Sequence, residues 1–149
     1  MNYKIVVNKD NLYNKDDFSN RELKVVKNSL DEEYLLEKRT LKAYLLLKEE
    51  LFKDNIYIDI ISGYRSIEDQ RKLIDFYTKK YSKDYVNRYV AGANTSEHHT
   101  GLCFDIGLII DNKLICDGKE LLEYDDIFKI IIDKLSKYGL IIRYPKDKE

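Results

Sequence analysis

The spacing of apolar residues predicts two helices in the first half of the chain. Over residues 31–53 the apolar positions recur with a helical period, so we expect one long amphipathic helix there. Its apolar stripe is predicted to comprise Leu36, Ala43, Leu47 and Leu51, widened by Leu41, Leu45 and Phe52. A second helix is expected directly after Ser66, because Asp69 follows three residues later in an arrangement that resembles a capping box.

Short runs of β-branched residues predict the strands. IYIDII, residues 56–61, is one of them, and GLCFDIGLII, residues 101–110, is another. In the second run Cys103 and Asp105 should face away from Leu102, Phe104 and Ile106, because side chains alternate along a strand. Residues 111–112 are Asp-Asn, which favours a turn, and KLIC then returns as the partner of a hairpin.

The remaining segments complete an α+β pattern. KIVVN from Lys4 is predicted as a short strand, residues 82–97 as a loop around a short element, and LIIRY from Leu140 as a last strand. Asp125 or Asp126 should cap a helix that ends near Gly139. A hairpin rules out an all-parallel sheet, so the expected fold is an antiparallel sheet flanked by helices, in a single domain over residues 1–149.

Composition narrows the classes of function. The 149 residues include 26 basic and 27 acidic side chains, and a net charge of −1 gives no bulk attraction to nucleic acid or membrane. No segment is apolar enough to span a bilayer and no signal peptide is visible, so the chain is interpreted as soluble. Cys103 and Cys116 are expected to be small buried residues, although one disulfide remains open.

Both histidines of the chain occur in TSEHHTGLCFDIG, residues 95–107, together with an acid that suits a metal site. His98 and Asp105 would be about 23 Å apart in an extended strand. A shared metal therefore requires the chain to bend, and Thr100-Gly101 can supply the bend. Spacing does not choose between His98 and His99, and by itself it favours the interpretation that both are surface loop residues and that Asp105 is a satisfied polar group at a sheet edge.

Two blocks together resemble the zinc D-alanyl-D-alanine carboxypeptidases of the VanY-like type. These blocks are SGYRSIEDQRKL and YVAGANTSEHHTGLCFDIG. The residues that match the family pattern are Ser62 to Ser66, Gln70, Ser96, Glu97, His98, Gly101, Leu102 and Asp105. The similarity runs in order over nearly the whole chain, and it implies the hedgehog/DD-peptidase fold and a substrate outside the membrane, in the cell envelope or beyond it.

The resemblance also assigns roles to single residues. It implies that His98 and Asp105 bind zinc, and that Arg65 holds the scissile carbonyl oxygen or a peptide carboxylate. Gln70 and Ser96 would contact the substrate, a peptidoglycan stem peptide ending in D-Ala. Without the resemblance, Arg65 would be interpreted as a surface ion pair, Gln70 as helix surface and Ser96 as a loop hydrogen bond.

The family pattern is incomplete in these 149 residues. A later segment of the family carries a glutamate, the general base, and a Trp-His pair whose histidine is the third zinc ligand. The sequence ends at Glu149, where that segment should begin, and it has no tryptophan and no histidine after His99. We therefore expect weakly held zinc and poor turnover. The alternatives are a non-catalytic relative that binds cell-wall peptide, or a domain that keeps only the fold and serves a protein partner.

Overall fold

Two small antiparallel sheets form the framework of the structure, a computed structural model that describes residue 3 and residues 7–142. The strands are β1 (Leu23–Lys27), β2 (Glu33–Glu37), β3 (Ile58–Ser62), β4 (Asp105–Ile110) and β5 (Lys113–Ile115). β1 pairs with β2, while β4 lies between β3 and β5, and each of these pairings is antiparallel. The expected α+β class is therefore confirmed.

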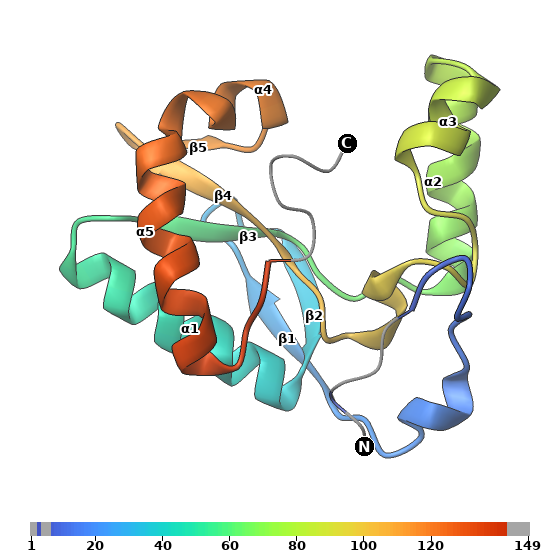
Figure 1. The fold of residues 1–149 in the computed structure, drawn as a ribbon, viewed down its shortest axis with the longest axis horizontal. Helices are drawn as coiled ribbons and strands as arrows, with labels where there is room; N and C mark the ends of the chain where they lie inside the picture. The colour runs from blue at the N-terminus through green and yellow to red at the C-terminus, as the bar shows by residue number, and fades with distance from the viewer. Residues whose placement is uncertain (1–2, 4–6, 143–149) are drawn as a thin grey trace.

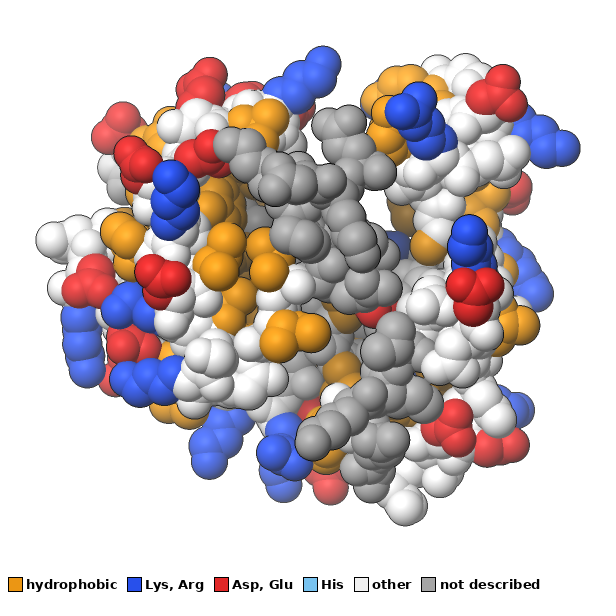
Figure 2. All heavy atoms as spheres, in the orientation of Figure 1, with side chains coloured by type: hydrophobic (Ala, Val, Ile, Leu, Met, Phe, Trp, Pro, Cys, Tyr) orange, Lys and Arg blue, Asp and Glu red, His pale blue; other side chains and the backbone are white. Residues whose placement is uncertain are grey.

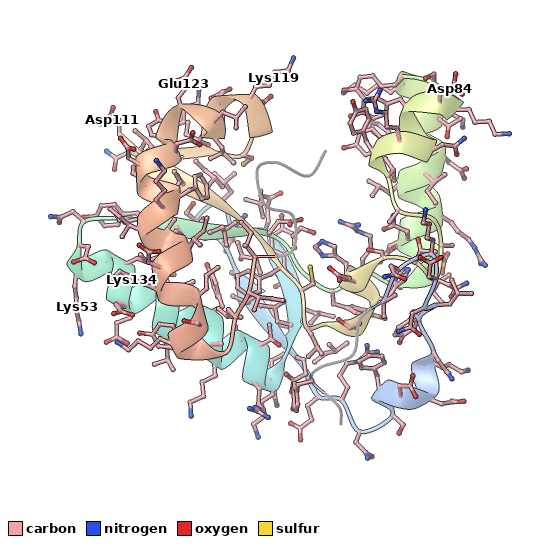
Figure 3. All side chains as sticks on the ribbon, in the orientation of Figure 1. Lys53, Asp84, Asp111, Lys119, Glu123 and Lys134 are labelled. Carbon is pink, nitrogen blue, oxygen red and sulfur yellow. The ribbon has the colours of Figure 1, made fainter. Side chains whose placement is uncertain are left out.

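Helices lie at both ends of this framework. They are α1 (Lys38–Lys53), α2 (Ile67–Lys80), α3 (Lys83–Tyr89), α4 (Gly118–Leu121) and α5 (Asp125–Leu135), with short 3-10 turns η1 (Lys15–Phe18), η2 (Glu97–Thr100), η3 (Leu122–Tyr124) and η4 (Ser136–Tyr138). α1 and α5 flank the larger sheet at one end, while α2 and α3 stand together at the other (Figure 1). Lys134 of α5 ties the first pair together, since its ammonium lies 3.7 Å from Glu50 and 3.2 Å from Asp54 of the α1 terminus (Figure 3).

The first helix is shorter than the apolar period suggested. It begins at Lys38, and the residues before it form strand β2 instead. Glu37 ends the strand and caps the helix, because its carboxylate accepts hydrogen bonds from the backbone N–H groups of Arg39 and Thr40. Asp31 adopts a positive φ of 65°, which belongs to the turn between β1 and β2 rather than to a helix.

One core joins β2, α1, β3, β4 and α5. Its fully or nearly buried members are Leu36, Tyr44, Leu47, Leu51, Ile56, Ile58, Ile60, Leu108 and Ile131. Leu47 and Leu51 lie on the buried face as predicted, and Leu41 packs partly buried against the core, but Leu45 and Phe52 are exposed, so the predicted widening of the stripe holds only at Leu41. The buried residues of α1 are Thr40, Tyr44, Leu47 and Leu51, so Tyr44 takes the buried place that was predicted for Ala43.

Several other elements agree only in part with the secondary structure predicted from the sequence. Ser66 caps α2 by accepting a hydrogen bond from the N–H of Asp69, and positive φ angles at residues 111–112 form the predicted turn. α5 begins after Tyr124, so neither predicted aspartate caps it, although both lie in its first turn. Residues 140–142 are not a strand, and the rest of the LIIRY prediction lies outside the described residues, as does most of KIVVN.

The surface agrees with the near-zero net charge. Figure 2 shows acidic and basic side chains interspersed over the visible face. Both cysteines are free, and Cys116 is exposed while Cys103 is only half-buried, so the expectation of two buried thiols is wrong. Within the described ranges, no helix combines the length and apolar character needed to cross a membrane.

Candidate metal and substrate site

Strand pairing brings the two sequence blocks together. β3 ends in the SGYRS segment, and its last residue, Ser62, pairs with Asp105 at the start of β4. A register irregularity between Ile60 and Ser62 interrupts the ladder at this point, as is common beside functional sites. The polar residues of both blocks therefore meet at one end of the larger sheet.

The predicted bend between His98 and Asp105 is present. Residues 97–100 form η2, and Gly101 then adopts a left-handed conformation with φ 78°. Glycine suits this position because a Cβ here would also lie 2.8 Å from the Leu23 side chain. As a result His98 Nε2 lies 3.3 Å from Asp105 Oδ2, although seven positions separate the two residues.

Backbone contacts orient the imidazole of His98. Its Nδ1 lies 2.8 Å from the carbonyl oxygen of Gly63, and a carbonyl can only accept, so Nδ1 carries a hydrogen and donates it. Nε2 is then the nitrogen that faces the Asp105 carboxylate. A backbone carbonyl that holds the far nitrogen of a histidine is the usual support of a metal-binding imidazole.

The surroundings of His98 decide its charge. Burial disfavours the imidazolium, but hydrogen bonds and charges from Asp105 and Cys103 outweigh burial and raise the pKa of His98 to about 10. His98 is thus a cation at neutral pH, paired with a carboxylate whose side chain is 55% exposed. A metal ion bound at Nε2 would replace that proton, so metal binding should strengthen as the pH rises.

Arg65 lies beside this pair and is held in place by polar contacts. Its guanidinium donates to Gln70 Oε1 at 2.7 Å and to Ser62 Oγ at 3.0 Å. Gln70 is buried, and its amide nitrogen donates to the carbonyl oxygen of Ala91 at 2.6 Å. In this structure Gln70 therefore anchors Arg65, and its predicted contact with substrate stays a prediction.

Ser96 precedes the bend and supports it. Its hydroxyl oxygen accepts a hydrogen bond from the backbone N–H of His98 at 3.2 Å, which makes Ser96 the N-cap of η2. Because Ser96 is buried, its predicted role as a substrate contact also stays a prediction. All five residues singled out from the sequence are nevertheless linked, since the backbone N–H of Arg65 donates to the carbonyl of His98.

His99 has a structural position that spacing did not reveal. It is 1% exposed, so it is not a surface loop residue, and it points away from Asp105. Its Nδ1 donates to the carbonyl oxygen of Arg65 at 2.7 Å, and its ring packs against Tyr13 at a centroid distance of 5.4 Å. Burial lowers the pKa of His99.

Arg21 is a further residue that the sequence gave no means of finding. Its guanidinium donates to the carbonyl oxygens of His99 at 2.8 Å and Thr100 at 3.0 Å, from 78 or more positions away in the chain. It also lies over the ring of Tyr64, 5.0 Å from the centroid. Arg21 therefore fastens the turn after His98 to the SGYRS segment.

We predict that His99 acts by positioning Arg65. His99→Asn keeps an N–H at the place of Nδ1 and should bind a carboxylate ligand at Arg65 as the unchanged protein does, whereas His99→Phe removes the donor and should weaken that binding by about tenfold, the cost of one hydrogen bond to a buried carbonyl. Calorimetric titration of both variants measures this. Equal affinities for the two variants, with both folded by circular dichroism, would contradict the positioning role.

The donor set suits part of a zinc site. Among the described residues, no group of three or more histidine, cysteine, aspartate or glutamate side chains is arranged so that it could hold a metal ion. Two donors of the right type do converge, however, and the backbone fixes the orientation of one of them. An imidazole nitrogen and a carboxylate oxygen are common zinc ligands, so His98 and Asp105 fit zinc as far as a pair can.

Comparison with known proteins gives the family. The sequence profile of VanY, D-alanyl-D-alanine carboxypeptidase, matches residues 33–149. The chain belongs to this VanY family. Over 94 residues the VanY-family chain is 35% identical to the bifunctional D-Ala-D-Ala dipeptidase and D-Ala-D-Ala carboxypeptidase VanXYC of Enterococcus gallinarum, which covers 62% of the chain and 48% of that protein.

Solved structures agree on the fold. The LD-carboxypeptidase LdcB, whose structure concerns peptidoglycan recognition, is 28% identical with a TM-score of 0.79, over 99% of this chain and 70% of that one. A VanY mutant in complex with Zn(II) is 24% identical with a TM-score of 0.70, over 99% of this chain and 80% of that one, and at that identity the likeness shows the fold alone. The hedgehog/DD-peptidase-like fold expected from the motifs is confirmed.

The comparisons also set a limit on what the family implies. The VanY-family chain spans about half the length of VanXYC and about a third of the D-alanyl-D-alanine carboxypeptidase of Enterococcus faecalis, to which it is 30% identical over 104 residues. The family is therefore established, while the activity and the substrate of this chain are matters for a proposal.

Proposed function

We propose that residues 1–149 form the zinc- and substrate-binding part of a D-alanyl-D-alanine carboxypeptidase that acts on peptidoglycan stem peptides. The observation that carries this proposal is the contact between His98 and Asp105. Two residues seven positions apart meet at 3.3 Å, and the nitrogen that faces the acid is the one that the Gly63 carbonyl leaves available. A surface histidine would need neither feature.

In this proposal His98 Nε2 and the Asp105 carboxylate hold the metal. Bound zinc supplies a Lewis acid and lowers the pKa of a bound water. The Gly63 carbonyl keeps the imidazole in the required orientation through the 2.8 Å contact with Nδ1. Asp105 remains exposed on its outer side, which leaves room for substrate and water to approach the same atoms.

Arg65 is the proposed anion-binding group of the site. Its two fixed hydrogen bonds, to Gln70 and Ser62, hold a planar guanidinium whose position is set before substrate arrives. Ser62 Oγ also lies 3.5 Å from His98 Nδ1, so Arg65 and the metal-binding histidine share a neighbour. A guanidinium here would bind the terminal carboxylate of D-Ala-D-Ala or the oxygen that becomes negative as the peptide bond is cleaved.

We also expect a low catalytic rate for the 149-residue polypeptide. Catalytic zinc usually has three protein ligands, and the structure brings together two of the expected type. The loss of a general base costs about 10²–10⁴-fold in rate, and in the part of the chain that the structure describes no residue beside His98 has been matched to the family's base. The second candidate is a non-catalytic relative that binds cell-wall peptide through Arg65.

Substitution of Arg65 tests the proposal. We expect Arg65→Ala to weaken binding of D-Ala-D-Ala by about 10- to 100-fold, because a charged hydrogen bond contributes about 1.5–3 kcal/mol, and Arg65→Lys to restore only part of it. Zinc affinity should stay unchanged in both variants, because Arg65 contacts the proposed ligand His98 through its backbone N–H, which both substitutions keep. The control is Arg71→Ala, on the exposed side of α2.

Two results of that experiment separate the candidates. Release of D-alanine from a peptide ending in D-Ala-D-Ala, with zinc present, would identify a carboxypeptidase. Binding without release would identify the peptide-binding relative. If D-Ala-D-Ala bound equally well to the unchanged protein, to Arg65→Ala and to the control, the proposed substrate site would be wrong.

A further inference from the structure

We propose that the hairpin of α2 and α3 carries a docking surface for an anionic lipid membrane, which the protein would touch from one side without crossing it. This inference goes beyond the proposed function and does not rest on the zinc site. The surface, called the aromatic tip below, consists of five rings that contact one another, those of Phe76, Tyr77, Tyr81, Tyr85 and Tyr89.

The rings of the aromatic tip form one continuous cluster. Neighbouring ring centroids lie 4.3–6.2 Å apart, and the Tyr81 ring stacks on those of Tyr77 and Tyr85. Three of the rings stay open to solvent, because Phe76 is 56% exposed, Tyr81 51% and Tyr89 56%. A tyrosine ring is apolar along its body and polar at its hydroxyl, which is why tyrosine is enriched where a membrane meets water. The cluster therefore has the composition of a membrane-interface contact.

The protein core leaves this hairpin largely uncovered. Gln70 is the buried residue of α2 and Val86 the buried residue of α3, and both helices lie wholly within the described residues. The hairpin stands at the end of the molecule away from α1 and α5 (Figure 1). At its base the Gln70 amide donates to the carbonyl oxygen of Ala91 at 2.6 Å. The aromatic tip is thus held on a fixed support, so docking would cost little ordering of the chain.

Basic side chains surround the aromatic tip. The ammonium of Lys80 lies 5.7 Å from the centroid of the Phe76 ring and 5.4 Å from that of the Tyr81 ring. The guanidinium of Arg88 lies 5.4 Å from the centroid of the Tyr89 ring. Four cations and one acid give residues 76–89 a net charge of +3, although the whole chain has −1; these residues are Lys79, Lys80, Lys83, Arg88 and Asp84. The attraction to an anionic surface is therefore local to the hairpin.

This combination of rings and cations suits an anionic lipid surface better than the other classes of partner. Each lysine or arginine near such a surface strengthens binding by about fivefold, while aromatic rings enter the headgroup layer. Protein–protein interfaces are depleted in lysine, which is abundant here. A neutral sugar needs an open ring face to stack on, whereas cations already lie over the rings of Phe76, Tyr81 and Tyr89.

Lipid vesicles provide the test, with phosphatidylglycerol mixed into phosphatidylcholine in one set and phosphatidylcholine alone in the other. We expect the unchanged protein to cosediment with the anionic vesicles and high salt to release it. Lys80→Gln/Arg88→Gln should bind these vesicles about 25-fold more weakly, because two cations are lost. Lys24→Gln/Lys42→Gln is the matched control, since it removes two exposed cations from β1 and α1 and should bind as the unchanged protein does.

The rings are tested separately from the charges. Tyr81→Ser/Tyr89→Ser should weaken vesicle binding by about tenfold, with the fold checked by circular dichroism. Because the chain contains no tryptophan, a single introduced indole reports its own surroundings. Fluorescence of Tyr81→Trp should shift to shorter wavelength when anionic vesicles are added. Tyr57→Trp should show no shift, since Tyr57 is also exposed but lies outside the hairpin, against Phe52.

Several results would overturn the inference. One is an unchanged protein that does not cosediment with anionic vesicles, and another is binding that both hairpin double variants retain in full. Binding of cell-wall glycan strands through the same residues, without binding to vesicles, would assign the surface to a polysaccharide instead. None of these results would alter the proposed zinc and substrate site, which is tested through its own metal and D-Ala-D-Ala affinities.

Discussion

Alanine at position 98 is expected to abolish specific zinc binding, with a loss of at least about 100-fold in affinity. Loss of an outer-shell partner of a zinc ligand alone costs about 10- to 100-fold, and His98 is proposed as a direct ligand. His98 Nε2 faces Asp105 at 3.3 Å, and no other imidazole can replace it, because His99 is buried and donates to Arg65. Chelator competition at a fixed pH measures the affinity.

The matched control for this change is the adjacent histidine. His99→Asn preserves a donor toward the Arg65 carbonyl and should leave zinc affinity unchanged, with the fold of both variants checked by circular dichroism. Equal loss of zinc from the two variants would mean that the structure assigns the wrong histidine. Zinc bound as tightly by His98→Ala as by the unchanged protein would mean that the metal binds elsewhere.

The second large effect is expected at Gly63. A Cβ at this position would lie 2.6 Å from the carbonyl oxygen of Leu35 in β2, which already accepts a hydrogen bond from the N–H of Tyr64 at 2.7 Å. Backbone cannot yield as a side chain can, so Gly63→Ala should lower the free energy of unfolding by about 1–3 kcal/mol. Because the Gly63 carbonyl orients His98, zinc affinity should fall as well.

Denaturant unfolding and chelator competition check the two parts of this prediction. The control is Gly118→Ala, where an added Cβ meets nothing within 4 Å and should change stability little. Equal stability of the two variants would show that the approach of β2 to Gly63 is looser than the structure has it. A destabilised Gly63→Ala that keeps full zinc affinity would show that the carbonyl contact does not orient His98.

The sequence predicts secondary structure correctly where neighbouring residues favour a single local conformation. Ser66 caps a helix because its hydroxyl reaches the N–H of Asp69, and residues 111–112 form a turn because Asp and Asn tolerate positive φ. The boundary at Lys38 was missed because Leu35 and Leu36 fit a helical stripe as well as a strand. Only the pairing with the preceding strand β1 decides in favour of the strand.

The sequence proposed candidate site residues, but it gave no sign of the groups that hold them in place. The family resemblance, rather than spacing alone, singled out His98, Asp105 and Arg65, and the strand pairing does bring them together. The groups that hold them come from elsewhere in the chain or from backbone atoms: the Gly63 carbonyl behind His98 and the distant Arg21 behind the turn. A sequence pattern records side chains at fixed spacing, whereas these contacts depend on how remote segments pack.

The most direct test of the central claim is the location of zinc itself. A crystal of the 149-residue chain grown with zinc, measured on both sides of the zinc absorption edge, would show the metal as an anomalous peak. We predict one strong peak at bonding distance, about 2.0–2.2 Å, from His98 Nε2 and an Asp105 carboxylate oxygen. A peak at Cys116 or on the surface, with the contact between His98 and Asp105 intact and metal-free, would contradict the account.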